Sequence, residues 1–183
     1  LIATVSNPNI DIDTGFNNFG RLSQVIGDTL IVNAPGDTNG GQTNSGAIYS
    51  FLYDFNGDGR VDGTALDDVI YGSPAQNLLT GGDGADTFVF QSATVFNAAD
   101  IITDFDATEG DILDFRDVLS GYDSMSDDIH DFVRLVSGNG GMQLQIDTDG
   151  SANGENFQTA VHLYGNTTLD LDSLIIDGNL LVE

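Results

Sequence analysis

The 183-residue chain has no cysteine and no lysine, and its only cations are four arginines. The absence of cysteine excludes disulfides, thiolate metal sites and a cysteine nucleophile. It fits a cytosolic protein, and equally an exported one that is stabilised by metal ions instead of disulfides. Against four cations stand 29 acidic residues, for a formal net charge of −25. Such a surface repels nucleic acid and anionic membranes.

Glutamate is also rare, because all but three of the acidic residues are Asp. Asp and the 23 glycines favour turns and loops, and Asp is a poor helix former. With 40% hydrophobic residues, the chain can still bury a core. This composition predicts an all-β chain with ion-binding loops, in which a divalent cation offsets the repulsion between carboxylates. The alternative is an acidic, solvated surface of the halophilic type.

Several familiar functional segments are missing. No hydrophobic run approaches the length of a transmembrane helix, and the first residues lack the pattern of a signal peptide. The chain begins with Leu1 instead of Met, which predicts a fragment of a longer protein. His130 and His162 lie far apart, and no H-E-x-x-H motif, nucleophile elbow or phosphate loop is present. Acidic pairs are too numerous for one to be nominated as an acid–base pair, so we expect a protein that is not an enzyme.

Residues 63–90 contain three nine-residue units, GTALDDVIY, GSPAQNLLT and GGDGADTFV. Each begins with glycine and has Asp or Asn at position six. The third unit follows the pattern G-G-x-G-x-D-x-U-x, the repeat of calcium-binding parallel β-rolls. Each unit predicts a turn followed by a very short strand, whose apolar residue at position eight (Ile70, Leu79 or Phe88) points into the roll.

Two units make one full turn of such a roll, so turns that are 18 residues apart stack on the same side. Asp68 and Asp86 have this separation, and we expect carboxylate and carbonyl oxygens of both turns to enclose one Ca²⁺. Asn77, in the middle unit, would be a weaker ligand than Asp. The alternative is a chance series of glycine turns in an ordinary sheet. The predicted ligands are Asp68, Gly81, Gly82, Asp83, Gly84 and Asp86.

Two further loops carry oxygen-bearing side chains at alternate positions. DFNGDGRVD, residues 54–62, matches the first nine positions of an EF-hand-like loop, but Ala65 stands where the twelfth-position Glu would be. In DTDGSANGE, residues 147–155, a calcium loop and a polar hairpin loop are equally open. The predicted ligands are Asp54, Asn56, Asp58, Asp62 and the Arg60 carbonyl in the first loop, and Asp147, Asp149, Asn153 and Glu155 in the second.

Short strands are also expected after residue 90. VRLV and MQLQI, joined by SGNGG, indicate a hairpin, and NFQTAVHLY indicates a third strand. LIIDGNLLV predicts a terminal hairpin with an Asp-Gly turn. We expect a short helix in SDDIHDFV, capped by Ser126, and a helical turn in DFRDVLSG that Gly121 ends.

The repeat ending in GGDGADTFVF and the later segments DIITDF, EGDILDF, VLSG, QIDTDG and DGNLLVE resemble the C-terminal region of RTX proteins, above all of large surface adhesins. The resemblance covers residues 63–183. It implies that the type I secretion machinery exports the chain across both membranes of a Gram-negative bacterium, guided by an uncleaved C-terminal signal. It also implies folding in external calcium and a secreted or cell-surface location.

The front of the chain resembles one FG-GAP unit, through NFG, NAPGD and SGAIYSF. One unit cannot close a propeller, so we expect residues 1–53 to form a few strands packed on the roll or on upstream sequence. This resemblance leaves open a second function, a calcium-dependent module that binds a carbohydrate or protein. A third is the accessory roll of a secreted enzyme whose catalytic part lies upstream.

The predicted fold is therefore all-β, a short calcium-binding parallel β-roll that continues into a β-sandwich-like C-terminal cap with a few short helices. The expected divisions are residues 1–62, 63–90 and 91–183, the last carrying the secretion signal. The expected function is calcium-dependent folding and type I secretion of a large adhesin. The expected partners are calcium ions, the secretion machinery and a host or surface ligand, with no nucleic acid and no membrane insertion. We expect a monomer.

Overall fold

The computed structural model describes the chain except for residues 1–21, 27, 35–46 and 139. The described residues are mostly β-strand and turn, with one short α-helix and one 3-10 helix, so the expectation of a mainly β fold is confirmed. The strands are β1 (Leu22–Ile26), β2 (Thr29–Ala34), β3 (Ala47–Tyr53), β4 (Arg60–Asp62), β5 (Val69–Tyr71), β6 (Leu78–Thr80), β7 (Thr87–Val89), β8 (Asp100–Ile102), β9 (Ile112–Asp114), β10 (Val133–Gly138), β11 (Gly141–Ile146), β12 (Gln158–Tyr164) and β13 (Leu180–Leu181), and the helices are η2 (Ile129–Asp131) and α1 (Leu171–Ile176).

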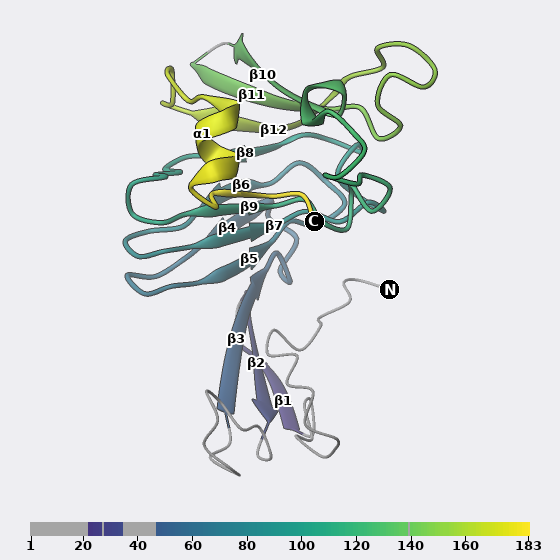
Figure 1. Cartoon of the computed structure of the whole chain (residues 1–183). Coiled ribbons are helices and arrows are strands. Elements are labelled where there is room, and N and C mark those ends of the chain that lie inside the picture. The colour runs from purple at the N-terminus through teal and green to yellow at the C-terminus, as the bar shows by residue number, and fades with distance from the viewer. Residues whose placement is uncertain (1–21, 27, 35–46, 139) are drawn as a thin grey trace.

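The described strands form two sheets. One has seven strands in the order β1-β2-β3-β5-β7-β9-β13, and the other has six in the order β10-β11-β12-β8-β6-β4. From β3 to β9 the chain alternates between the sheets, so that two successive strands and their turns make one rung, as in a β-roll. In Figure 1 these strands form stacked layers, with β10–β12 at one end and β1–β3 extending from the other.

The nine-residue units explain this alternation. Each unit supplies one turn and one three-residue strand, so the strands of alternate units, β5 and β7, pair in parallel. The preceding nine residues, 54–62, have the same arrangement, and their strand β4 pairs in parallel with β6. The three residues at position eight, Ile70, Leu79 and Phe88, are at most 1% exposed. The predicted stacking interval of 18 residues and the inward direction of these side chains are therefore confirmed.

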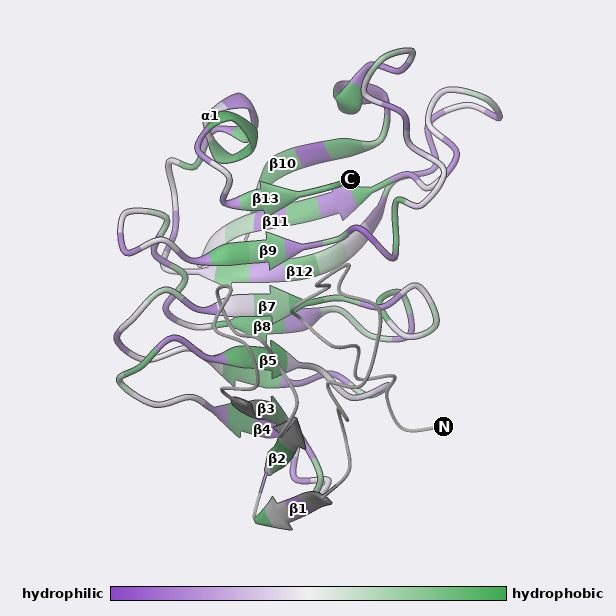
Figure 2. Cartoon of the chain, turned by 60° about the horizontal axis from the view of Figure 1, so that its bottom comes forward, coloured by the Kyte–Doolittle hydropathy of each residue, from purple (hydrophilic) through white to green (hydrophobic). Residues whose placement is uncertain are grey.

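Two rows of apolar side chains fill the space between the sheets. In the three-residue strands β4, β5, β6, β7 and β9 the middle residue points to the face opposite its neighbours and enters a row. In β8 the last residue, Ile102, has this place. Figure 2 shows that the strands are mainly hydrophobic and that the turns carry the hydrophilic residues. The rows are Leu52, Ile70, Phe88, Leu113 and Leu180 in the seven-stranded sheet and Val61, Leu79, Ile102 and Leu163 in the six-stranded sheet, and all nine are buried.

The parallel ladder continues beyond the nonapeptides, with longer connections. Residues 90–99 lead into β8, which pairs with β6, and residues 103–111 lead into β9, which pairs with β7. The six-stranded sheet is then extended by β12, parallel to β8, and by β11 and β10, which are antiparallel. The predicted β10–β11 hairpin and the third strand are confirmed.

The predicted terminal hairpin is wrong. Its first half is the helix α1, where the Asp170 carboxylate caps the N-terminus by accepting the N–H of Ser173 at 3.0 Å. Gly178 has a φ of 82° just after the helix, so the Asp-Gly pair ends a helix instead of turning a hairpin. The chain then returns as β13, parallel to β9.

The other two helical segments are present. The 3-10 helix η2 lies in SDDIHDFV, but its N-cap is Asp128 and not Ser126, because the Asp128 carboxylate accepts the N–H of His130 at 3.0 Å. In DFRDVLSG, the N–H groups of Val118 and Leu119 both donate to the Phe115 carbonyl at 2.9 Å, which makes the single helical turn expected there.

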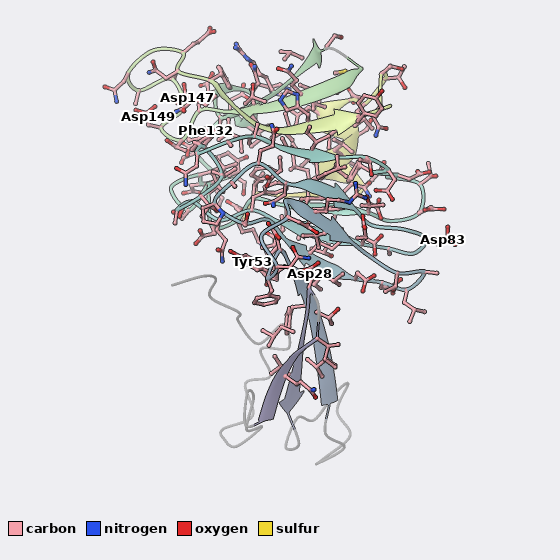
Figure 3. All side chains as sticks on the ribbon, turned by 180° about the vertical axis from the view of Figure 1, so that it is seen from behind. Asp28, Tyr53, Asp83, Phe132, Asp147 and Asp149 are labelled. Atoms are coloured by element: carbon pink, nitrogen blue, oxygen red, sulfur yellow. The ribbon has the colours of Figure 1, made fainter. Side chains whose placement is uncertain are left out.

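The strands β1, β2 and β3 are antiparallel and join the seven-stranded sheet through β3 and β5. The Asp28 carbonyl accepts the N–H of Tyr53 at 2.8 Å, and both residues lie where these strands meet the stacked turns (Figure 3). Much of the FG-GAP-like stretch lies outside the described residues. Within the described part of the chain, no helix is both long and apolar enough to cross a membrane.

Replacing Phe88 with Ala should lower the free energy of unfolding by about 3–5 kcal/mol, because its fully buried ring fills the space between the sheets. Leu66→Ala is the control: this turn residue is 73% exposed, and its loss should change the same quantity by less than about 0.5 kcal/mol. Urea unfolding of both variants at one fixed calcium concentration gives the comparison. Similar losses in the two variants would contradict the placement of Phe88.

Candidate metal centre

The turns that lead into the parallel strands gather at two opposite edges. Turns that lead into the seven-stranded sheet form what we call the Asp86 edge, and those that lead into the six-stranded sheet form the Asp54 edge. Figure 3 shows Asp83 on one side of the molecule and Asp147 and Asp149 on the other. The Asp86 edge contains residues 63–68, 81–86 and 103–111, and the Asp54 edge contains residues 54–59, 72–77, 90–99 and 147–157.

A row of buried carboxylates runs along the Asp86 edge. Asp68, Asp86 and Asp111 each stand directly before a strand of the seven-stranded sheet. The Asp86 carboxylate accepts the N–H of Asp68, and the Asp111 carboxylate accepts the N–H of Asp86, both at 2.9 Å. The Asn179 amide closes the row by donating to the Asp111 carbonyl at 2.7 Å. The side chains of Asp86 and Asp111 therefore each fasten their own turn to the preceding one.

The second oxygen of each acid has a different environment. In Asp68 it accepts the N–H of Thr64 at 2.6 Å, and in Asp111 it accepts the N–H of Asp106 at 2.8 Å. In Asp86 this atom, Oδ2, has no hydrogen-bond partner, although the residue is 0% exposed. Within the described residues it is the one buried side-chain nitrogen or oxygen without a partner. An unpaired buried carboxylate oxygen is costly, and a bound cation would compensate it.

Glycines allow the turns around this carboxylate to approach each other closely. A side chain on Gly81 would collide with Asp86 Oδ2, and one on Gly82 would collide with the Thr64 carbonyl oxygen. Gly82 also has a φ of 102°, which side-chain-bearing residues rarely adopt. A side chain on Gly63 would collide with the Gly81 carbonyl oxygen. The turns at 63–64 and 81–82 are thus in close contact, with oxygens from both.

The electrostatic surroundings of the row favour a positive ion. Burial is the largest cause that raises the pKa of Asp86 from 3.8 to about 6, and the nearby charges of Asp111, Asp68 and Asp104 contribute to this rise, against the hydrogen bond from Asp68. Burial also raises the pKa of Asp111. Among the described residues, no arginine pairs with this row. The ion pairs of the described arginines are Arg60–Asp62 at 2.9 Å, Arg116–Asp114 at 2.6 Å and Arg134–Glu155 at 3.5 Å.

These features fit Ca²⁺, which prefers carboxylate and backbone carbonyl oxygens. Asp86 Oδ2 would supply the charged oxygen, and the carbonyls of the two glycine-containing turns would supply neutral ones. Within the part of the chain that the structure describes, no group of three or more His, Cys, Asp or Glu side chains is arranged to hold a metal ion. Of the other predicted ligands, Asp83 is exposed, whereas Asp68 already has hydrogen-bond donors on one oxygen from Thr64.

The Asp54 edge carries a second polar row. The Asn77 amide donates to the Asp54 carboxylate at 3.1 Å, and the Asn77 N–H donates to the Asp100 carboxylate at 2.8 Å. All three side chains are buried. Burial raises the pKa of Asp100 to about 7, against the opposing effect of the Asn77 hydrogen bond. A side chain on Gly72 would lie 2.5 Å from the other Asp100 oxygen, so this carboxylate also depends on a glycine.

The structure brings together part of the loop 54–62. The Asp54 carboxylate accepts the N–H groups of Gly57 and Gly59 at 2.7 and 3.2 Å. In the same way, Asn56 accepts from the N–H of Asp58 at 2.7 Å, and Asp58 accepts from the N–H of Arg60 at 2.9 Å. Asp62, the ligand predicted at position nine of the loop, is instead paired with the Arg60 guanidinium on the exposed face of β4.

In the loop 147–155, as in the loop 54–62, the carboxylates accept hydrogen bonds from nearby residues instead of pointing together. Buried Asp147 accepts the N–H of Asn156 at 2.6 Å, and Asp149 accepts from the Asn153 amide at 2.5 Å, a bond that holds the pKa of Asp149 below its ordinary value. The fourth predicted ligand, Glu155, lies next to Arg134, whose guanidinium stacks over the Phe157 ring at 4.0 Å.

Sequence reasoning missed four acids at these edges: Asp28, Asp100, Asp104 and Asp111. Asp28 accepts the N–H groups of Phe55 and Asn56 at 3.1 and 3.2 Å. Asp100 and Asp111 could have been found, because each stands two residues before a buried apolar residue, as position six does in the nonapeptides. No sequence signal identifies Asp28 or Asp104.

Comparison with known proteins adds no identity: no family model, no curated protein and no solved structure matches the chain.

The raised pKa of Asp100 predicts how stability depends on pH when calcium is removed. A carboxyl group with a raised pKa in the folded chain favours folding while it is protonated. Its contribution is complete below the ordinary pKa of about 3.8 and is lost as the pH rises through about 7. The protein in EDTA should therefore be less stable at pH 7.5 than at pH 5. Asp100→Asn should reduce this difference by about 1–3 kcal/mol, because the amide stays neutral.

Urea unfolding in EDTA at the two pH values measures this effect, with the same concentration of a stabilising osmolyte in every sample so that the chelated chain is folded before urea is added. Glu109→Gln is the matched control, because it removes one charge from an exposed side chain and should leave the difference unchanged. An Asp100→Asn variant with the full pH dependence of the natural sequence would contradict the assignment.

Proposed function

We propose that this chain is a calcium-dependent folding module, in which ions bound between stacked turns stabilise a parallel β-roll that continues into a β-sandwich-like cap. The observation that carries the proposal is Asp86, a fully buried carboxylate with one oxygen that no donor satisfies. It lies in the one unit that matches the calcium-binding repeat at every position.

The chain's own residues explain why folding would need an ion. Bound Ca²⁺ would supply the positive charge that the described arginines do not bring to the Asp86 row. Without it, Asp68, Asp86 and Asp111 bring three carboxylates into one buried row in a chain of net charge −25. Since an ion that binds only the folded chain adds its binding free energy to stability, millimolar calcium would drive folding.

The resemblance to RTX adhesins supports the cellular part of the proposal. At the low calcium concentration of the cytosol, the acidic turns would keep the chain unfolded and able to pass through the type I secretion machinery. The segment 91–183 would carry the C-terminal signal, and the chain would fold at the cell surface or in the medium. In this role it is a non-catalytic part of a large exported adhesin.

Chelation should remove most of the β signal in circular dichroism, and added calcium should restore it, because the buried carboxylates repel one another without an ion. Asp86→Asn should raise the calcium concentration needed for half-refolding on the order of tenfold, since it removes the charge of the buried carboxylate whose Oδ2 has no donor. Glu109→Gln should refold like the natural sequence. A β signal that is indifferent to EDTA would refute the calcium requirement.

Export can be tested with a reporter fused in front of residues 63–183, in a Gram-negative host that carries a type I secretion system. We expect the fusion to reach the medium, and deletion of residues 171–183 to retain it in the cytosol, because the deletion removes the end of the signal-bearing segment. Immunoblots of medium and cells give the ratio. Equal release of the intact and shortened fusions would contradict the signal assignment.

A further inference from the structure

The turn that contains Asp86 donates two of its N–H groups to a carboxylate of a neighbouring turn. Asp104, in the connection 103–111 one rung further on, accepts two backbone N–H groups at 3.0 Å each. Its Oδ1 binds the N–H of Gly81 and its Oδ2 binds the N–H of Gly82. Both oxygens of Asp104 are therefore engaged with the turn that contains Asp86.

Other turns of the roll show what these N–H groups do when no such carboxylate is present. The N–H of Thr64 donates to the side chain of Asp68 at 2.6 Å, and the N–H of Ser73 donates to the side chain of Asn77 at 2.5 Å. In each case the donor is the residue four positions before the acceptor. The equivalent donor for Asp86 is Gly82, whose N–H goes to Asp104 instead.

We propose that Asp104 is a positioning residue for a divalent cation at Asp86. By holding the N–H groups of Gly81 and Gly82, it prevents the turn from satisfying Asp86 internally and leaves Oδ2 free for the ion. Gly82 can present its N–H away from Asp86 because its φ of 102° is accessible to glycine. This inference rests on the calcium-binding function proposed above, and it assigns to Asp104 a role in preparing the site without contacting the ion.

A double-mutant cycle tests the proposal. The full 183-residue chain and its Asp86→Asn, Asp104→Ala and doubly substituted forms are titrated with CaCl₂ by calorimetry at pH 7.5. Asp104→Ala should weaken binding at the Asp86 site on the order of tenfold, because the freed N–H of Gly82 then competes for Asp86. In the Asp86→Asn background the same substitution should cause almost no further loss, because it acts through Asp86.

Two variants separate hydrogen bonding from charge. Asp104→Asn removes the same charge as Asp104→Ala but keeps an oxygen that can accept one N–H, so it should bind calcium more tightly than Asp104→Ala. Glu109→Gln removes one charge from the same connection and should stay within about twofold of the natural sequence. Circular dichroism in saturating calcium checks folding, and if Asp104→Ala does not fold, Asp104→Asn replaces it in the cycle.

The outcomes are distinct. Losses that add in the double variant would make Asp104 an independent ligand and overturn the proposal, as would an Asp104→Ala variant with natural affinity. Equal affinities for Asp104→Asn and Asp104→Ala would show that only the negative charge of Asp104 affects calcium binding, and this result would also overturn the proposal. If the natural sequence itself binds no calcium, the proposed function fails and this inference fails with it.

Discussion

The structure depends on carboxylate and amide side chains buried where the parallel strands begin. Strands of three residues make few ladder bonds, and Asp86 and Asp111 each add a strong bond to the preceding rung. The same side chains bring negative charge out of water, which opposes folding. The groups that keep the rungs in register are therefore the groups whose charge must be compensated.

The two edges differ in the groups that compensate their buried carboxylates. On the Asp54 edge, Asn77 stands between two acids, donating its amide to Asp54 and its N–H to Asp100. On the Asp86 edge all three members of the row before Asn179 are acids, and Asp104 adds a fourth carboxylate. The row on the Asp54 edge is thus partly satisfied by its own amide, whereas the carboxylates on the Asp86 edge accept from backbone N–H groups and from the Thr64 hydroxyl. This difference explains why the unpaired oxygen lies on the Asp86 edge.

The nonapeptide period was sufficient to predict the central strands, because a fixed interval of 18 residues places Ile70 and Phe88 on neighbouring strands. The 18-residue period did not predict the later rungs, because their spacing is longer: Asp100 follows Asn77 by 23 residues and Asp111 follows Asp86 by 25. The terminal hairpin failed for another reason, since an Asp-Gly pair suits both a hairpin turn and a helix end. The choice of Asp104 over Asp86 as acceptor for Gly82 depends on a neighbouring rung, and no local pattern reveals it.

The return of the chain as β13 has a kinetic consequence. Contacts within the stacked rungs join residues 18 to 25 positions apart, whereas Asn179 reaches Asp111 across 68 residues and Glu183 reaches Ser124 across 59. Longer loops cost more entropy to close and slow the search for native contacts. The rungs can therefore nucleate and grow one upon another, while closure of the seven-stranded sheet by β13 is the slow, late step in assembly.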